Sequence, residues 1–255
     1  MTASHTPTPP SPADGPALST TLLIDKPYTW TSFDVVNKIR RELCRHLGVK
    51  KLKVGHAGTL DPLATGLMLV CTGRATKSID TLQAQTKEYV ATLALGATTP
   101  SFDLEHDIDA RYPVDHITAE LVHATLQQFR GRIEQVPPAF SAVKVDGHRA
   151  YALARRGRDV ELAPKELVID ELEVTDASRL PHELTLRIVC SKGTYIRALA
   201  RDIGQALGSG AHLLALRRTR IGPYAVDQAM TLDAFHAWLQ TLPHPTPNTP
   251  TITPL

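Results

Sequence analysis

Proline is concentrated at the two ends of this 255-residue chain, and its distribution most constrains how much of the chain can fold. Proline fixes φ and has no amide hydrogen, and segments rich in Pro, Thr and Ser bury too little apolar surface to become ordered. We therefore predict disordered tails at residues 1–19 and 241–255 and a folded region at residues 20–240. The terminal prolines are Pro7, Pro9, Pro10, Pro12 and Pro16, then Pro243, Pro245, Pro247, Pro250 and Pro254.

The clearest helix signal follows a short apolar strand at residues 21–24. Thr31 or Ser32 is a suitable N-cap, and Asp34 lies in the first turn, where the helix dipole favours an acid. Apolar residues then recur at helical spacing, and Gly48 provides a C-terminal stop. The pattern predicts a helix from about residue 32 to residue 47.

Strands and helices alternate irregularly along the rest of the folded region. We predict strands at residues 88–95, 168–174 and 184–190, the last from its alternating apolar residues. Helices are expected at residues 118–129 and 194–207, with a last structured piece at residues 232–239. This order favours an α+β fold with a mixed sheet over a doubly wound parallel one.

Composition limits the class of protein only weakly. The formal net charge is +2, but basic residues cluster at positions 38–53, 149–158 and 217–220. These clusters indicate either one basic face or three ordinary solvated faces.

The three cysteines lack metal or disulfide spacing, which suits a reducing compartment. We expect no signal peptide and no membrane span, and hence a cytoplasmic protein.

The stretch Gly55-His56-Ala57-Gly58-Thr59-Leu60-Asp61-Pro62-Leu63-Ala64-Thr65-Gly66 is the strongest candidate for chemistry. Three glycines within it permit tight turns and close approach of the backbone to a ligand. Asp61 precedes a proline, which pushes its backbone towards an extended conformation and helps to fix its carboxylate. The segment Gly73 to Ser78 lacks the glycine of a phosphate-binding loop, and Gly55 to Gly58 matches a KH-domain clamp only weakly.

The residues around this stretch resemble the TruB family of bacterial tRNA pseudouridine-55 synthases. The resemblance covers nearly all of the folded region, in the family's order. Its blocks are Leu23-Ile24-Asp25-Lys26-Pro27 with Trp30-Thr31-Ser32, Lys53 to Gly66, Lys87-Glu88-Tyr89 before Leu95-Gly96, Phe129-Arg130-Gly131 to Lys144, Cys190 to Arg197, and Gly210-Ala211-His212 to Arg218.

The resemblance implies a fold and a set of site residues. The fold would be that of pseudouridine synthases, α+β with a mixed, mostly antiparallel sheet flanked by helices and a central catalytic cleft, so residues 20–240 would form one catalytic domain. Asp61 matches the catalytic aspartate, Tyr89 the tyrosine that stacks on the target base, and Arg197 the arginine that pairs with the aspartate. The residues expected to bind substrate or RNA are Lys26, His56, Gly58, Thr59, Tyr195, Leu216 and Arg218.

The chemistry of the implied reaction agrees with these residue types. Isomerising uridine breaks the N1–C1′ bond and joins C5 to C1′, so it consumes no electron, phosphate or water and needs no cofactor or metal. It does need a nucleophile, here a carboxylate kept ionised by a guanidinium, and a base outside the stack. The expected partner is the T-arm of tRNA, bound by a monomer with no obligate protein partner and no membrane contact. The basic stretch Arg149 to Arg158 follows a segment that matches the family's RNA-gripping insertion.

Three other functions remain open from the sequence. The chain could be an RNA-binding or RNA-folding module, although the retained Asp61, Tyr89 and Arg197 argue for catalysis. A nucleoside glycosidase would usually show two cooperating carboxylates, whereas this motif offers one. A guide-RNA-dependent synthase would be expected to keep the C-terminal PUA domain that many family members carry. The region after residue 239 is too short for such a domain, so we expect none here.

Overall fold

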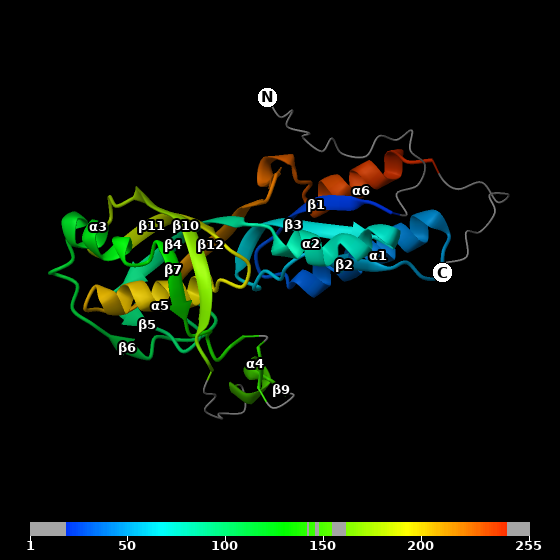
Figure 1. Cartoon of the computed structure of the whole chain (residues 1–255). Coiled ribbons are helices and arrows are strands. Elements are labelled where there is room, and N and C mark those ends of the chain that lie inside the picture. Colours follow the sequence, from blue (N-terminus) through cyan, green and yellow to red (C-terminus); the bar gives the residue numbers. More distant parts are fainter. Residues whose placement is uncertain (1–18, 142, 146–147, 155–161, 244–255) are drawn as a thin grey trace. The chain divides into compact units, whose positions relative to one another are not determined.

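The computed structural model describes residues 19–141, 143–145, 148–154 and 162–243 (Figure 1). Backbone packing divides the chain into two compact units. Unit 1 combines residues up to Gln83 with residues from Arg220 onwards, and unit 2 contains Ala84–Thr219. The predicted tails at 1–19 and 241–255 lie almost wholly outside the described residues, as does part of the basic stretch Arg149 to Arg158. The single catalytic domain at residues 20–240 stays a prediction.

Unit 1 is built on three antiparallel strands. β1 (Thr21–Lys26) pairs along its whole length with β3 (Ala64–Thr72), and β2 (Val54–His56) also pairs with β3. β3 is buried almost throughout, so its apolar run shows no alternation of polar and apolar residues. Leu67 and Leu69 of this strand form a core cluster with Ala57 and Ile221.

Two helices complete unit 1. α1 (Ser32–Leu47) begins at the N-cap Thr31, which exchanges hydrogen bonds with Asp34 in a capping box, and it ends at Gly48 with φ +65°. Gly48 suits this end because a left-handed φ is unfavourable for residues that carry a Cβ. α6 (Leu232–Thr241) starts at the N-cap Thr231 and contacts both α1 and β1 (Figure 1). The helix predicted at residues 32–47 is therefore confirmed.

Unit 2 contains a sheet with strand order β12-β4-β11-β10-β7. β4 (Lys87–Leu95) pairs antiparallel with β11 (Glu183–Cys190), β11 with β10 (Lys165–Asp176), and β10 with β7 (Gly131–Gln135). Alternate residues of β4 are buried, and α5 (Ile196–Ala206) contacts both β4 and α3 (Ala119–Gln127). β12 (Ala211–Ile221) continues from unit 2 into unit 1.

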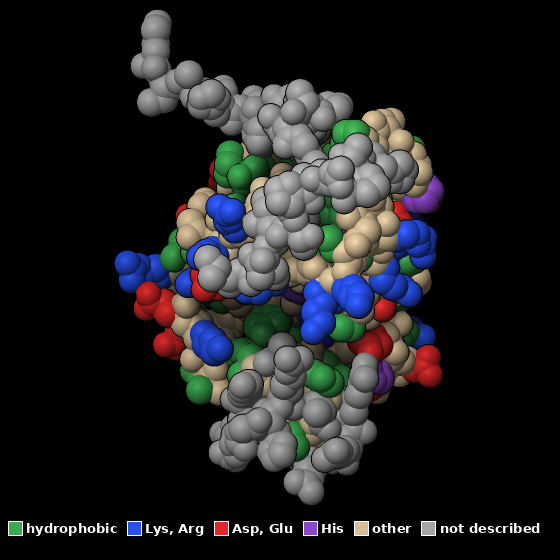
Figure 2. All heavy atoms as spheres, turned by 90° about the vertical axis from the view of Figure 1, so that its right-hand side faces the viewer, with side chains coloured by type: hydrophobic (Ala, Val, Ile, Leu, Met, Phe, Trp, Pro, Cys, Tyr) green, Lys and Arg blue, Asp and Glu red, His purple; other side chains and the backbone are tan. Residues whose placement is uncertain are grey.

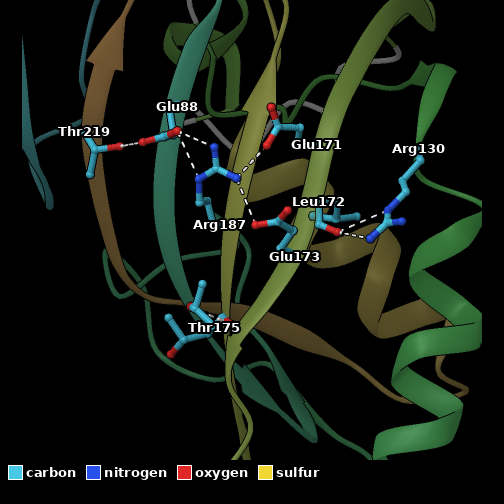
Figure 3. A network of polar contacts seen from close by, with 9 residues as sticks. Glu88, Arg130, Glu171, Leu172, Glu173, Thr175, Arg187 and Thr219 are labelled. Atoms are coloured by element: carbon cyan, nitrogen blue, oxygen red, sulfur yellow. Dashed lines mark hydrogen bonds and ion pairs between the residues drawn. The ribbon is translucent and has the colours of Figure 1, made fainter. Parts of the chain in front are cut away.

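A polar network crosses four strands of this sheet (Figure 3). The Arg187 guanidinium on β11 donates to Glu88 on β4 at 2.8 and 3.0 Å, and to Glu171 and Glu173 on β10 at 2.6 and 2.9 Å. Thr219 on β12 donates to the other oxygen of Glu88 at 2.8 Å. These carboxylates raise the pKa of Arg187 above its usual value, with Glu171 the largest cause. The network therefore links four neighbouring strands through one guanidinium.

The remaining described elements are short. They are η2 (Gly73–Ser78), α2 (Ile79–Ala84), β5 (Ala97–Thr98), β6 (Ala110–Arg111), β8 (Lys144–Val145), β9 (His148–Arg149), α4 (Ala150–Ala154), β13 (Tyr224–Ala225) and η3 (Val226–Gln228).

The predicted α+β fold with a mixed, mostly antiparallel sheet flanked by helices is confirmed. The pairings of β3 with β1 and β2, and those that join β4, β11, β10 and β7, are antiparallel, and Ile24 and Met230 form a parallel bridge in unit 1. The central catalytic cleft stays a prediction.

Candidate active site

Asp61 lies in the loop between β2 and β3 of unit 1 and is half-buried. The loop contains a hydrogen-bonded turn, because the Asp61 carbonyl accepts a hydrogen bond from the Ala64 amide at 3.1 Å. Gly58 and Gly66 flank it, each with φ +102°. Residues with a Cβ rarely adopt this backbone conformation, so glycine is needed at both positions.

Two buried polar side chains hold the residues on either side of Asp61. On one side, the buried Ser32 hydroxyl accepts from the Leu60 amide at 2.8 Å and donates to the Leu60 carbonyl at 3.0 Å. On the other side, the Lys26 ammonium donates to the Pro62 carbonyl at 3.1 Å. Because both neighbours are fixed, the backbone that carries Asp61 has little freedom to move.

Lys26 is completely buried, and its ammonium also donates to the carbonyls of Pro27 at 3.0 Å and Trp30 at 2.6 Å. A buried ammonium is costly unless hydrogen-bonded, and three carbonyls satisfy its three hydrogens. These contacts give Lys26 a positioning role for the Asp61 loop. The predicted RNA contact of Lys26 stays a prediction.

The other predicted residues of unit 1 lie just before Asp61. His56 is the last residue of β2 and pairs with Val70 of β3, so its backbone is fixed by the sheet. Gly58 and Thr59 follow in the loop, and Thr59 is exposed. Within unit 1, the structure thus places Lys26, His56, Gly58, Thr59 and Asp61 on or against one loop.

In unit 2, Tyr89 lies on β4 and Tyr195 is the N-cap of α5. Tyr89 is 8% exposed and pairs with Ile188 of β11. The Tyr195 amide donates to the buried Gln135 side chain at 2.9 Å, which fixes the start of α5 against the end of β7. Gln135 is a supporting residue that the sequence did not reveal.

Arg197 is 5% exposed in the first turn of α5 and is held by three groups. Its guanidinium donates to the carbonyls of Ser101 at 3.1 Å and Phe140 at 3.0 Å, and its Nε lies 3.7 Å from Oδ2 of Asp103. The predicted partner of Arg197, Asp61, belongs to the other unit, so that pairing stays a prediction.

Asp103 is the second site residue that the sequence did not reveal. It is 6% exposed, and its Oδ1 accepts from the Ser101 hydroxyl at 2.6 Å and from the Glu105 amide at 2.9 Å. These bonds leave Oδ2 directed at Arg197. Nothing in the spacing connects position 103 with position 197, and an Asp in a polar loop is an ordinary turn former.

Leu216 and Arg218 lie on β12, where Leu216 is half-buried and Arg218 is 1% exposed. The third basic cluster is therefore not simply a solvated face.

The buried Lys87 of β4 donates to the Gln85 carbonyl at 2.5 Å. Burial, followed by the Arg218 charge, lowers the pKa of Lys87 to about 8. Burial also raises the pKa of the neighbouring Cys190 thiol to about 11.

Two further findings concern the described residues alone. They contain no group of three or more His, Cys, Asp or Glu side chains placed to hold a metal ion. None of their helices is both long and apolar enough to cross a bilayer.

Comparison with solved structures gives the class of fold. A chain from the "Crystal Structure of a Cbf5-Nop10-Gar1 Complex" matches with a TM-score of 0.67 and 28% identity, over 93% of this chain and 60% of that one. A chain from the "Structure of H/ACA RNP bound to a substrate RNA containing 2'-deoxyuridine" matches with a TM-score of 0.61 and 27% identity, over 88% of this chain and 55% of that one. The fold is that of the pseudouridine synthases, as the sequence predicted.

Comparison of sequences gives the family. Residues 45–196 match the TruB family pseudouridylate synthase (N terminal domain), and residues 197–247 match the tRNA pseudouridylate synthase B C-terminal domain. The tRNA pseudouridine synthase B of Phocaeicola vulgatus is 65% identical over 86% of this chain and 92% of its own length. That of Thermobifida fusca is 47% identical over 87% of this chain and 76% of its own length. The chain belongs to the TruB family, and the predicted enzyme class, a tRNA pseudouridine synthase and thus an isomerase, is confirmed.

Proposed function

We propose that this enzyme isomerises uridine 55 in the T-loop of tRNA, with Asp61 as the nucleophile acting on a base flipped out of the loop. The observation that carries the proposal is the hydrogen-bonded fixation of Leu60 and Pro62, on either side of Asp61. A nucleophile gains rate when its position is fixed before the substrate arrives. The tRNA pseudouridine synthases at 63–65% identity support tRNA as the substrate.

Three side chains take part in the proposed reaction: Asp61, Arg197 and Tyr89. When the Asp61 carboxylate attacks the nucleotide, the N1–C1′ bond breaks and the uracil turns. C5 then bonds to C1′, the bond to Asp61 breaks, the proton on C5 leaves and N1 takes up a proton. Three routes stay open: attack at C1′, attack at C6, or elimination. Arg197 pairs with the aspartate and orients its carboxylate, since a planar guanidinium can bind both carboxylate oxygens. Tyr89 stacks on the uracil and is the candidate for moving the C5 proton.

The remaining predicted residues receive and hold the RNA. His56 enters the T-loop and helps displace the flipped nucleotide, while Tyr195 and Leu216 line the uracil pocket. Gly58 lets the backbone approach the RNA closely, and Thr59, beside it, is exposed. Arg218 is the predicted basic contact from β12. We propose that the enzyme acts as a monomer in the cytoplasm on the T-arm, without an obligate protein partner.

The test is chemical mapping of pseudouridine in tRNA incubated with the purified protein and with its Asp61→Asn variant. We expect the wild type to modify position 55. Asp61→Asn should abolish product while keeping tRNA affinity within several-fold, because it is nearly isosteric and removes only the nucleophile. Leu63→Met, a mild change in the same loop at a residue without a proposed role, serves as the control for loop disturbance. Comparable product from Asp61→Asn would show that another group is the nucleophile.

A further inference from the structure

Two aromatic side chains are exposed on the segment that joins β1 to α1. Tyr28 is 49% exposed, and Phe33, the second residue of α1, is 65% exposed. A single exposed apolar residue needs no explanation, but two aromatic rings within six residues are unusual in an ordered segment. We call residues 27–33 the aromatic turn.

The aromatic turn is held in a strained conformation. Thr29 has φ +69°, which is rare for a β-branched residue. The turn persists because the buried Lys26 ammonium binds the carbonyls of Pro27 and Trp30, and because the capping box of Thr31 and Asp34 fixes the start of α1. Strain of this kind tends to occur where a protein presents groups to a ligand.

The aromatic turn and the Asp61 loop belong to one hydrogen-bonded assembly within unit 1. Lys26, which closes the turn, also binds the Pro62 carbonyl, and Ser32, inside the turn, binds both backbone groups of Leu60. The segment that carries the exposed rings is therefore fixed to the Asp61 loop.

The charge along α1 suits a nucleic acid. Arg41 and Arg45 are exposed, on the side of the helix away from the buried Val36 and Ile39. Asp34 is engaged, because its carboxylate accepts from the Thr31 amide and hydroxyl. Figure 2 shows Lys and Arg side chains at the surface, with hydrophobic side chains exposed among them. Exposed rings and exposed cations on one element can together bind unpaired nucleotides, by stacking and by phosphate contact.

We propose that Tyr28 and Phe33 form a stacking platform for unpaired bases of the RNA whose uridine reacts at Asp61. This inference rests on the proposed function, because the RNA is the substrate of that reaction. The rings act in binding and stay outside the chemistry. They explain why the chain keeps two aromatic side chains in water beside its catalytic loop.

The experiment compares Tyr28→Ala, Phe33→Ala and the double variant with the wild type. The dissociation constant for tRNA and the single-turnover rate at saturating enzyme are both measured. We expect each single variant to bind tRNA about fivefold or more weakly and the double variant about 25-fold or more weakly, as for lost base stacking. The rate at saturation should stay within about twofold, because the rings do not touch the reacting atoms.

Two further variants test whether the loss of affinity comes from the aromatic ring and from this turn. Phe33→Leu keeps apolar surface but has no ring, so it should lose as much affinity as Phe33→Ala. Ile108→Ala removes another exposed apolar side chain, 44% exposed in unit 2, and should bind like the wild type. Full affinity in the Leu variant, or an equal loss in the Ile108 variant, would overturn stacking at this turn.

The outcomes separate this inference from the proposed function. If the wild type forms no pseudouridine in tRNA, the proposed function fails. If the wild type is active and the double variant binds and reacts like it, only the platform is wrong. In that case the exposed rings are better explained as a contact for another protein.

Discussion

At the scale of single residues, the arginine of the site depends on contacts that lie far away in sequence. Arg197 donates to the carbonyls of Ser101 and Phe140 and faces Asp103, so two separate segments, one at residues 101–103 and one at Phe140, determine where its guanidinium points. A planar guanidinium can serve carbonyls and a carboxylate at once, whereas an ammonium acts as a point charge. The geometry of the side chain matters here as much as its charge.

We therefore predict that Arg197→Lys lowers the single-turnover rate on tRNA by about tenfold or more, a cost of about 1.4 kcal/mol in the barrier. Asp103→Asn should act in the same direction, because it removes the charge opposite Nε while preserving the shape. Rapid-quench measurement of pseudouridine formation at saturating enzyme decides this. Circular dichroism of each variant serves as the folding control. Activity of Arg197→Lys within a factor of two of the wild type would contradict the proposed role.

Asp103 and Gln135 could not be predicted as site residues from the sequence. Asp61 could be singled out because its motif is contiguous and contains three glycines, two of which, Gly58 and Gly66, adopt φ +102° in the structure. Asp103 and Gln135 become site residues only through the fold, which brings them to Arg197 and to the start of α5. Tertiary proximity of this kind leaves no local pattern.

At the scale of elements, helices were easier to predict than strands. The helices at residues 32–47 and 118–129 carry N-caps and apolar spacing, and the structure has them at Ser32–Leu47 and Ala119–Gln127. β3 and β12 were not predicted as strands. β3 is buried almost throughout and so lacks alternation, while the arginines of β12 suggested a surface segment although Arg218 is buried.

The network around Arg187 connects neighbouring strands of the unit 2 sheet, and one of these strands carries Tyr89. Glu88 stands next to Tyr89 on β4, so the contacts of Glu88 with Arg187 and Thr219 hold the strand that presents Tyr89. Exposed ion pairs usually contribute little, but this guanidinium serves three carboxylates and is only partly exposed. Its loss would also leave the three carboxylates close together without their cation.

We predict that Arg187→Met lowers the free energy of unfolding by about 1–2 kcal/mol, within the usual range for breaking such a network. Arg132→Met is the matched control, because Arg132 makes a single pair with Glu166 in which both side chains are mostly exposed. That variant should change stability by less than about 0.5 kcal/mol. Urea unfolding at low and high salt measures both. Equal effects of the two substitutions would show that the network adds nothing to an ordinary surface pair.

At the scale of the whole molecule, net charge is a poor guide to this protein. The formal charge of +2 results from 28 basic and 26 acidic residues, yet positions 38–53 contain seven basic residues and one acid. Of these, Arg41, Arg45, Lys50, Lys51 and Lys53 are exposed. An RNA backbone responds to charge within about one Debye length, roughly 8 Å at physiological salt, so local placement outweighs the total.

The last prediction separates placement from total charge. The double variants Arg41→Gln/Arg45→Gln and Arg132→Gln/Arg179→Gln each have a formal net charge of 2 − 2 = 0, starting from the same +2. Arg132 and Arg179 already pair with Glu166 and Glu183 in unit 2. Each lost phosphate contact should reduce the slope of log affinity against log salt by about 0.7–0.9. We expect the first variant to lose about 1.5 from that slope and to bind tRNA more weakly at low salt, and the second to match the wild type. Equal slopes in the two variants, measured by filter binding across a salt series, would mean that total charge governs the association and that α1 does not contact RNA.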